Sequence, residues 1–156
     1  MITIDIPEFK KIEANHLVLD FNGTLAVDGK LIEGTRPLLK SLGHELIIHV
    51  LTADTFGTSK NELIDINCKH VILRPSQQDK QKEHYVISLG KEHVIAIGNG
   101  VNDRLMLTQA ALGIVIIQQE GAFGKLICEA DMVCLTILDA LTLLLNPLRI
   151  IATLRN

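Results

Sequence analysis

Four polar side chains, each following an aliphatic stretch, could together carry out phosphate chemistry. Asp20 and Thr52 directly follow two such stretches, while Lys80 and Asp103 come a few residues after two later ones. A carboxylate can attack phosphorus, a hydroxyl can hydrogen-bond a phosphoryl oxygen, and a lysine offsets negative charge. Oxygen ligands also suit a divalent cation. These residue types therefore predict a site for phosphate and a metal ion.

The aliphatic stretches that precede these residues predict the strands of a parallel sheet. They are apolar throughout, as expected for strands covered on both faces. The predicted strands span 17–19, 46–51, 71–73, 94–97, 114–117 and 132–135. Helix-like segments follow at 35–43, 58–66, 78–89, 102–112, 122–130 and 137–145, with a last short helix after Pro147. Alternation of this kind predicts an α/β fold, a three-layer doubly wound parallel sheet, and residues 1–6 are interpreted as an additional strand.

Sites in doubly wound sheets form where the strands end at their carboxyl termini. The polar residues after the strands should therefore share one edge. They are Asp20, Asn22, Gly23, Thr24, Thr52, Asp54, Lys80, Asn99, Gly100, Asn102 and Asp103.

The order and the residues of these segments resemble the conserved motifs of the haloacid dehalogenase (HAD) superfamily. DFNGTLA at 20–26 resembles its motif D-x-D-G-T-L, and GNGVNDRLML at 98–107 resembles G-D-G-V-N-D. LTADT at 51–55 resembles the second motif, and RPSQQDK at 74–80 resembles the segment with the third-motif lysine. The closest likeness is to the phosphorylation domain of P-type ATPases. It implies one Rossmann-like HAD catalytic core over residues 1–156.

The resemblance implies a role for each matching residue. Asp20 would be the nucleophile that forms an aspartyl-phosphate, and Thr52 and Lys80 would contact the phosphoryl group. The implied catalytic residues are Asp20, Asn22, Thr52 and Lys80. The implied phosphate-binding residues are Phe21, Thr24, Thr52, Ala53, Lys80 and Asn102. The implied Mg²⁺ ligands are Asp20, Asn22 through its backbone carbonyl, Asn99 and Asp103.

Two amides stand where the HAD pattern has carboxylates. Asn22 occupies the place of the usual general acid and base, and an amide cannot exchange that proton. Asn99 replaces a metal-binding Asp, which removes one negative charge. The sequence thus predicts a slow Mg²⁺-dependent phosphohydrolase. The alternative is a phosphate-binding or regulatory module with little turnover.

Taken singly, several of these residues also have ordinary structural interpretations. Asp20, Asn22 and Gly23 could form only a turn at the end of a strand, because Asn and Gly favour turns. Thr52 could cap a helix, and Lys80 could be a solvated lysine on a helix surface. The common order of the four motifs favours the functional interpretation.

The segments between the motifs are too short for a cap domain. Between Leu25 and Thr52 there is room for a hairpin at 27–32 with its turn at Asp28–Gly29, one helix and one strand. Between Thr52 and Lys80 there is room for a helix and a strand. We therefore expect an open site that admits a small or a macromolecular phosphorylated substrate.

Composition excludes other classes of protein. The 156 residues suggest one domain, and the net charge of −3 argues against a nucleic-acid partner. Cys68, Cys128 and Cys134 show no disulfide or zinc pattern. Without a signal sequence or a span of about 20 apolar residues, the sequence predicts a cytoplasmic protein with no membrane partner. The apolar stretch 141–156 is interpreted as packing on the sheet, with a homo-oligomer interface as the alternative.

Overall fold

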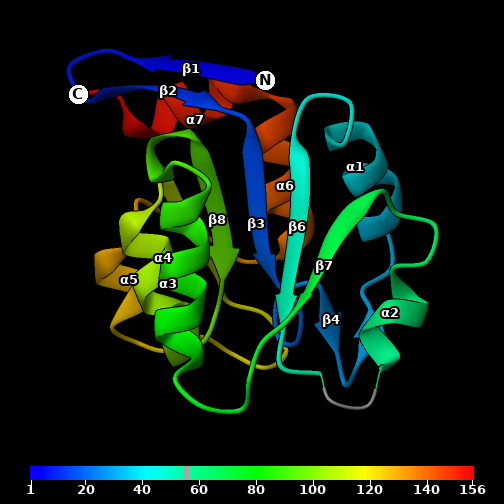
Figure 1. Ribbon diagram of the computed structural model, residues 1–156. Helices are drawn as coiled ribbons and strands as arrows, with labels where there is room; N and C mark the ends of the chain where they lie inside the picture. Colours follow the sequence, from blue (N-terminus) through cyan, green and yellow to red (C-terminus); the bar gives the residue numbers. More distant parts are fainter. Residues whose placement is uncertain (55–56) are drawn as a thin grey trace.

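Six parallel strands form the central sheet of the computed structural model, which describes residues 1–54 and 57–156. The sheet order is β10-β9-β8-β3-β6-β7 (Figure 1). The strands are β3 (His16–Asp20), β6 (Ile47–Thr52), β7 (Cys68–Ile72), β8 (Val94–Gly98), β9 (Leu112–Ile116) and β10 (Met132–Cys134). Within this sheet the chain first forms β3 and then adds β6 and β7 on one side of it. It then crosses back to form β8, β9 and β10 on the other side of β3. The predicted doubly wound parallel α/β sheet is confirmed.

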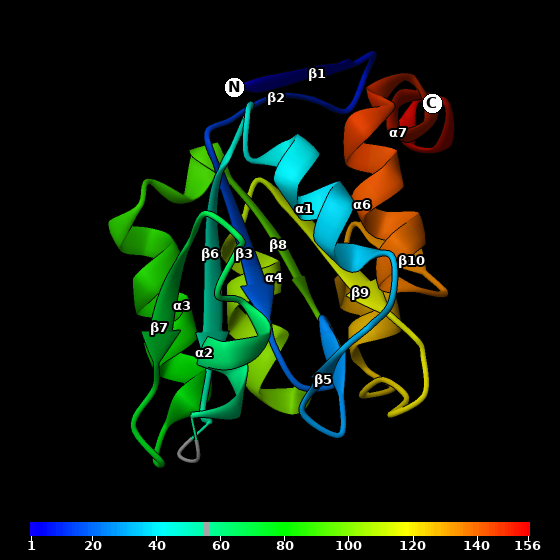
Figure 2. The ribbon, with the colours of Figure 1, turned by 90° about the vertical axis from the view of Figure 1, so that its right-hand side faces the viewer.

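Helices cover both faces of this sheet (Figure 2). One face carries α3 (Gln78–Ser88), α4 (Arg104–Gln109) and α5 (Leu126–Glu129), whereas α1 (Thr35–Leu42) and α6 (Ile137–Leu145) lie on the other. The remaining helices are α2 (Thr58–Glu62), α7 (Pro147–Leu154) and the 3₁₀ turns η1 (Lys91–His93) and η2 (Val101–Asp103).

Alternate residues of the same strand feed two separate aliphatic cores. In β3, Leu17 and Leu19 pack toward α1 and α6, while Val18 packs toward α3 and α4. All three side chains are fully buried. Successive side chains of a strand point to opposite faces, so a strand covered on both sides must be apolar throughout. This requirement fixes the sheet in the middle layer and leaves the strand ends to carry polar residues.

An antiparallel hairpin closes the amino ends of the strands. β1 (Ile2–Ile6) pairs with β2 (Lys10–Ala14), and β1 contacts α7. Figure 1 shows both chain termini at this end of the molecule. The strand expected at 1–6 is confirmed, but β2 was not predicted because three of its five residues are charged. Its apolar residues Ile12 and Ala14 are buried on one face.

Some predicted element boundaries were wrong. The helix expected at 122–130 is only α5, and the helix expected at 58–66 ends at Glu62. The expected strand at 71–73 is β7, which begins three residues earlier at Cys68, because Lys69 and His70 interrupt the apolar pattern of this edge strand. The predicted hairpin is present as β4 (Ala26–Val27) and β5 (Lys30–Leu31).

Helix length and hydropathy give no membrane-spanning segment among the described residues. Only α6 and α7 taken together reach the required length and apolarity, and they are bent by 102° at the break between them.

A buried histidine links β3, β6 and α3 through its two ring nitrogens. The Nε2 atom of His49 lies 3.0 Å from Nδ1 of His16, and its Nδ1 atom lies 2.9 Å from the hydroxyl of Tyr85. Burial, together with the neighbouring charges of His16 and Lys69, lowers the pKa of His49 to about 4. His49 is therefore neutral in the native protein at pH 7.

We expect this histidine to destabilise the protein in mild acid. Because its native pKa lies below its value of 6.5 in an unfolded chain, the unfolded state binds more protons, and stability falls as pH drops from 6.5 toward 4. The loss should be up to about 3.5 kcal/mol, at about 1.4 kcal/mol per pKa unit. Urea unfolding of wild type and His49→Gln over this pH range should show a steeper decline for wild type. Parallel curves for the two proteins would contradict the assignment.

Candidate active site

A buried lysine joins two buried carboxylates at the carboxyl ends of β3 and β8. Lys82 Nζ donates to Asp20 Oδ1 and to Asp103 Oδ1, and each distance is 2.6 Å. The side chains of Lys82 and Asp103 are 1% and 0% exposed, and that of Asp20 is 9% exposed. Three charges in this arrangement sum to one net negative charge. The lysine therefore offsets part of the charge of both acids.

The lysine that contacts Asp20 and Asp103 is Lys82, and not the predicted Lys80. Lys80 is exposed on α3, whereas Lys82 points into the site. The inward face of α3 carries Val86, which is one turn after Lys82, and residues four apart share a helix face. Lys80 is two positions from Lys82 and so projects from another side. The sequence held a signal, since Val86 and Leu89, four and seven residues after Lys82, lie on the side of α3 that packs in the core.

A tight turn after β3 presents Asp20 at the sheet edge. The Phe21 carbonyl accepts hydrogen bonds from the N–H groups of Thr24, Leu25 and Ala26. Gly23 has φ = 79°, and a Cβ there would lie 2.5 Å from Nδ2 of Asn99. A glycine is therefore needed at this position both for the backbone conformation and for the close approach of Asn99. Asn22 is exposed beside the turn, where a substrate could meet it.

Asp103 is held in place by the backbone that follows β8. Its Oδ2 atom accepts from the N–H groups of Asn99 and Gly100, each at 2.9 Å. A Cβ at Gly98 would lie 2.5 Å from the Asp103 carboxyl carbon, so only glycine leaves room for this side chain. The carboxylate thus has fixed partners for both oxygens.

Asn99 connects the turn after β3 with the segment after β9. Its Oδ1 accepts from the Thr24 hydroxyl at 3.3 Å, and its Nδ2 donates to the Gly121 carbonyl at 2.9 Å. Gln118, which sequence analysis did not single out, donates from Nε2 to the carbonyls of Gly23 and Thr24 at 3.0 and 2.7 Å. Nothing in the local sequence pattern of Gln118 distinguishes it from a surface glutamine.

Three other predicted residues lie at the same edge without a contact to Asp20 among the interactions described. The Thr52 hydroxyl accepts from the Asp54 N–H at 3.0 Å, and Ala53 follows it, half-buried. Asn102 Nδ2 donates to Gln78 Oε1 at 3.1 Å. Their position at the ends of β6 and β8 is as predicted, but their phosphate-binding roles stay predictions. Thr55, the last residue of the LTADT motif, lies outside the described residues.

Burial and like charge control the protonation of the site. Burial and then the charge of Asp103 raise the pKa of Asp20 to about 7, although Lys82 acts in the opposite direction. Burial lowers the pKa of Lys82, but the two carboxylates outweigh it and raise that pKa above its ordinary value. Lys82 is therefore a cation at neutral pH, and the two acids compete for the stabilisation that it provides.

The residues predicted to hold Mg²⁺ offer the oxygen donors that a hard divalent cation prefers. Asp20, the Asn99 amide oxygen and the Asn22 carbonyl are all oxygen donors, as Mg²⁺ prefers. Within residues 1–54 and 57–156, no group of three His, Cys, Asp or Glu side chains is spaced to hold a metal ion. Only two of the predicted ligands, Asp20 and Asp103, are carboxylates, because Asn99 stands where the HAD pattern has an Asp. Because both oxygens of Asp103 have protein partners, Asp103 is a weaker candidate ligand than predicted.

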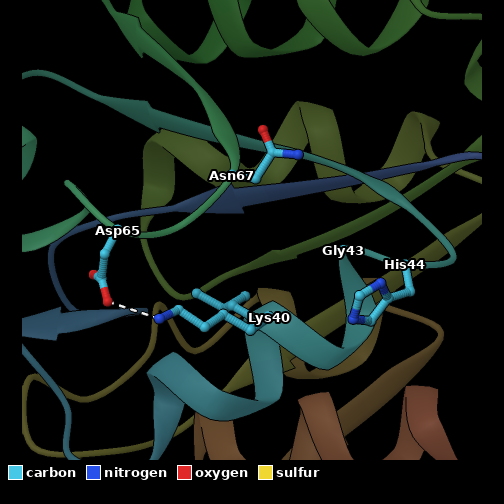
Figure 3. Close-up of a pocket in the computed structure, with 6 residues that line it drawn as sticks. Lys40, Gly43, His44, Asp65 and Asn67 are labelled. Atoms are coloured by element: carbon cyan, nitrogen blue, oxygen red, sulfur yellow. Dashed lines mark hydrogen bonds and ion pairs between the residues drawn. The ribbon is translucent and has the colours of Figure 1, made fainter.

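A separate hollow of about 330 Å³ lies at the opposite edge of the sheet (Figure 3). It is lined by Lys40, His44, Asp65 and Asn67, among others, and Lys40 donates to Asp65 at 2.8 Å. These residues precede β6 and β7, at the amino ends of the strands. This hollow is therefore remote from the carboxyl edge, where sites of this fold form.

The fold is that of HAD-superfamily proteins. The 3-deoxy-D-manno-octulosonate 8-phosphate phosphatase of Moraxella catarrhalis, solved with magnesium, phosphate and KDO, superposes with a TM-score of 0.72 at 14% identity, over 91% of this chain and 94% of that one. A putative HAD-superfamily subfamily III A hydrolase of Legionella pneumophila gives 0.72 at 16% identity, over 89% and 86%. The cobalt-bound phosphatase of Haemophilus influenzae gives 0.72 at 13% identity, over 86% and 89%.

The chain belongs to the same family as uncharacterized protein MJ0073 of Methanocaldococcus jannaschii. The two are 54% identical over 63 residues, which cover 40% of this chain and 68% of that protein. Uncharacterized protein MJ0072 of the same organism is 46% identical over 39 residues, covering 25% of this chain and 89% of that protein. No protein-family model matches the chain.

Proposed function

We propose that the chain is a HAD-type phosphohydrolase that acts through an aspartyl-phosphate on Asp20. The observation that carries this proposal is the buried Lys82, which lies 2.6 Å from both Asp20 and Asp103. A lysine at this point stabilises the nucleophile and would also stabilise a phosphoryl group bound to it. The likeness of the fold to HAD-superfamily phosphatases supports the same reaction class.

In the first step an Asp20 carboxylate oxygen attacks phosphorus, the bond between phosphorus and the alcohol oxygen breaks, and the departing alkoxide takes a proton from water. Lys82 would stabilise the charge on the phosphoryl oxygens, and Thr52 and Asn102 would orient them. A divalent cation held by Asp20, Asn99 and the Asn22 carbonyl would supply further charge stabilisation. Water then hydrolyses the acyl-phosphate and restores Asp20.

The side chain of Asn22 is an amide, so it cannot donate a proton to the departing alcohol as a carboxylic acid would. We therefore propose that turnover is slow or that the aspartyl-phosphate persists, as in the P-type ATPases that the motifs resemble. A second candidate function follows from the same residue, which is an exposed amide beside Asp20. In this second function the chain is a regulatory module that binds phosphate at the site but catalyses little hydrolysis.

Release of inorganic phosphate from a panel of phosphate esters, with Mg²⁺ and after chelation, tests the proposal. A phosphohydrolase releases phosphate from at least one ester in the presence of metal. The binding module binds inorganic phosphate in calorimetry but releases none. Absence of both turnover and phosphate binding would refute both candidate functions.

The substitution Asn22→Asp should raise the rate of hydrolysis. The new carboxyl group can protonate the leaving alcohol and then activate water, and such help is worth roughly 10²–10⁴-fold. The rate should be measured on an ester with a poor leaving group, such as an alkyl phosphate, because protonation matters most there. Asn22→Ala serves as the control, and a similar rate for the Asp and Ala variants would contradict this account of Asn22.

A further inference from the structure

A hollow of about 390 Å³ lies between the start of α3 and the turn η2. Its walls are formed by Pro75, Gln77, Gln78, Asp79, Val101 and Asn102. None of these six side chains is a cation, and three are amides. All six residues lie in the motif segments 74–80 and 98–107, but only Asn102 has a role in the proposed reaction.

The hollow adjoins the lysine–carboxylate cluster. Gln78 precedes Lys82 by one turn on α3 and so shares its helix face, and Asn102 precedes Asp103. The hydrogen bond of 3.1 Å from Asn102 Nδ2 to Gln78 Oε1 ties the two walls together. A phosphate ester with its phosphoryl group at Asp20 could therefore place its alcohol part in the hollow.

The wall contributed by α3 is held in a fixed shape. Gln81 accepts from the Arg74 N–H at 3.0 Å and donates to the Ser76 carbonyl at 2.5 Å, which pins the loop before the helix. Gln77 has φ = 53°, a conformation that is costly for a residue other than glycine. Such strained residues are found at ligand-binding positions, where the surroundings hold them. The hollow is thus preformed.

The chemistry of the walls selects among alcohols. Amide groups donate and accept hydrogen bonds and so match hydroxyl groups, while the Asp79 carboxylate repels an anion. Building on the phosphohydrolase function, we propose that this hollow is the leaving-group subsite and that it selects an uncharged, hydroxyl-bearing alcohol over an acidic one. The substrate class is therefore a neutral polyol phosphate, in contrast to the octulosonate phosphate of the phosphatases with this fold.

Two three-carbon esters test the selection directly. Glycerol 3-phosphate and 3-phosphoglycerate share a skeleton, but the first has a hydroxymethyl group where the second has a carboxylate. Their affinities should be measured by calorimetry on the Asp20→Asn variant, which cannot form the acyl-phosphate. We expect the glycerol ester to bind about 10-fold more tightly, because a like charge near Asp79 costs affinity. Equal affinity, or tighter binding of the acid, would overturn the subsite.

Two substitutions on α3 separate the subsite from the net charge of the helix. Asp79→Asn and Glu83→Gln each remove one negative charge, but only Asp79 lines the hollow. Asp79→Asn should reduce the preference to about 3-fold or less, whereas Glu83→Gln should preserve it. An equal effect of the two would assign the preference to the overall field and refute the role of Asp79.

Failure of the subsite and failure of the phosphohydrolase function give different results. If wild type hydrolyses no ester but Asp20→Asn prefers the glycerol ester, the subsite stands and the enzymatic function fails. If wild type hydrolyses both esters and the affinities are equal, the enzymatic function stands and the subsite fails.

Discussion

Replacing Asp20 by Asn should abolish both the labelled phosphoenzyme and phosphate release, by roughly 10⁴-fold or more in rate. The amide has almost the same shape as the carboxylate, so it can still accept a hydrogen bond from Lys82. It is a poor nucleophile, however, and cannot form the acyl-phosphate bond. The protein should therefore remain folded while the chemistry is lost.

The measurement is acid-quenched labelling with a ³²P-phosphate ester in the presence of Mg²⁺, followed by peptide mapping. Label on the peptide that contains Asp20 in wild type, and none in the variant, is the expected outcome. Asp54→Asn is the matched control, since it is a second buried acid at the same sheet edge that has no proposed bond to phosphorus. Phosphate release by Asp20→Asn at the wild-type rate would exclude Asp20 as the nucleophile.

The same substitution should also change the pH dependence of stability. Since burial raises the native pKa of Asp20 to about 7, the native state binds this proton more tightly than the unfolded chain, whose value is 3.8. Stability should therefore fall as pH rises from 3.8 toward 7, and the decline should be smaller in Asp20→Asn. This effect opposes that of His49 in the same pH range, so each has to be measured as wild type minus variant in metal-free buffer.

Replacing Lys82 by Met should remove most of the stability and nearly all of the activity. It leaves two buried carboxylates without their shared cation, and breaking a buried ion pair in this way costs about 3–5 kcal/mol. Loss of a preorganised positive charge at the phosphoryl group should slow the reaction by roughly 10²–10³-fold. Urea unfolding and phosphate release on the folded fraction measure the two effects separately.

Lys80→Met is the matched control for this prediction. Lys80 lies on the same helix and carries the same charge, but its side chain is exposed, so the change should stay within about 0.5 kcal/mol and leave the rate unchanged. A larger effect of Lys80→Met than of Lys82→Met would indicate that Lys80, and not Lys82, is the catalytic lysine. The double variant Lys82→Met with Asp103→Asn should recover part of the lost stability, because it removes one of the uncompensated charges.

The strands of the sheet were predictable because they obey a simple rule. Strands β3, β8 and β9 are covered on both faces, so the residues between their ends are apolar or glycine. β2 was not predicted because only one of its two faces is buried. Lys10, Lys11 and Glu13 therefore interrupt the apolar pattern. Its pairing with β1 is a tertiary effect that the local sequence does not contain.

The site was predictable to the extent that motif spacing records strand ends. Asp20 ends β3 and Asp103 lies five residues after β8, and the structure brings them to the same lysine. Choosing between Lys80 and Lys82 required the rotation of α3, which a motif match does not specify but the positions of Val86 and Leu89 do. Gln118 required knowledge of how the segment after β9 returns to the turn at Gly23, and this is a contact between residues almost a hundred positions apart.

Both ends of the chain lie beside the β1–β2 hairpin, at the amino ends of the strands, while Asp20 lies at the other end of β3 (Figure 1). An affinity tag, a fluorophore or a surface tether attached to either terminus would therefore lie at the end of the sheet opposite Asp20. Immobilised or labelled protein is thus suited to the kinetic and calorimetric measurements proposed above.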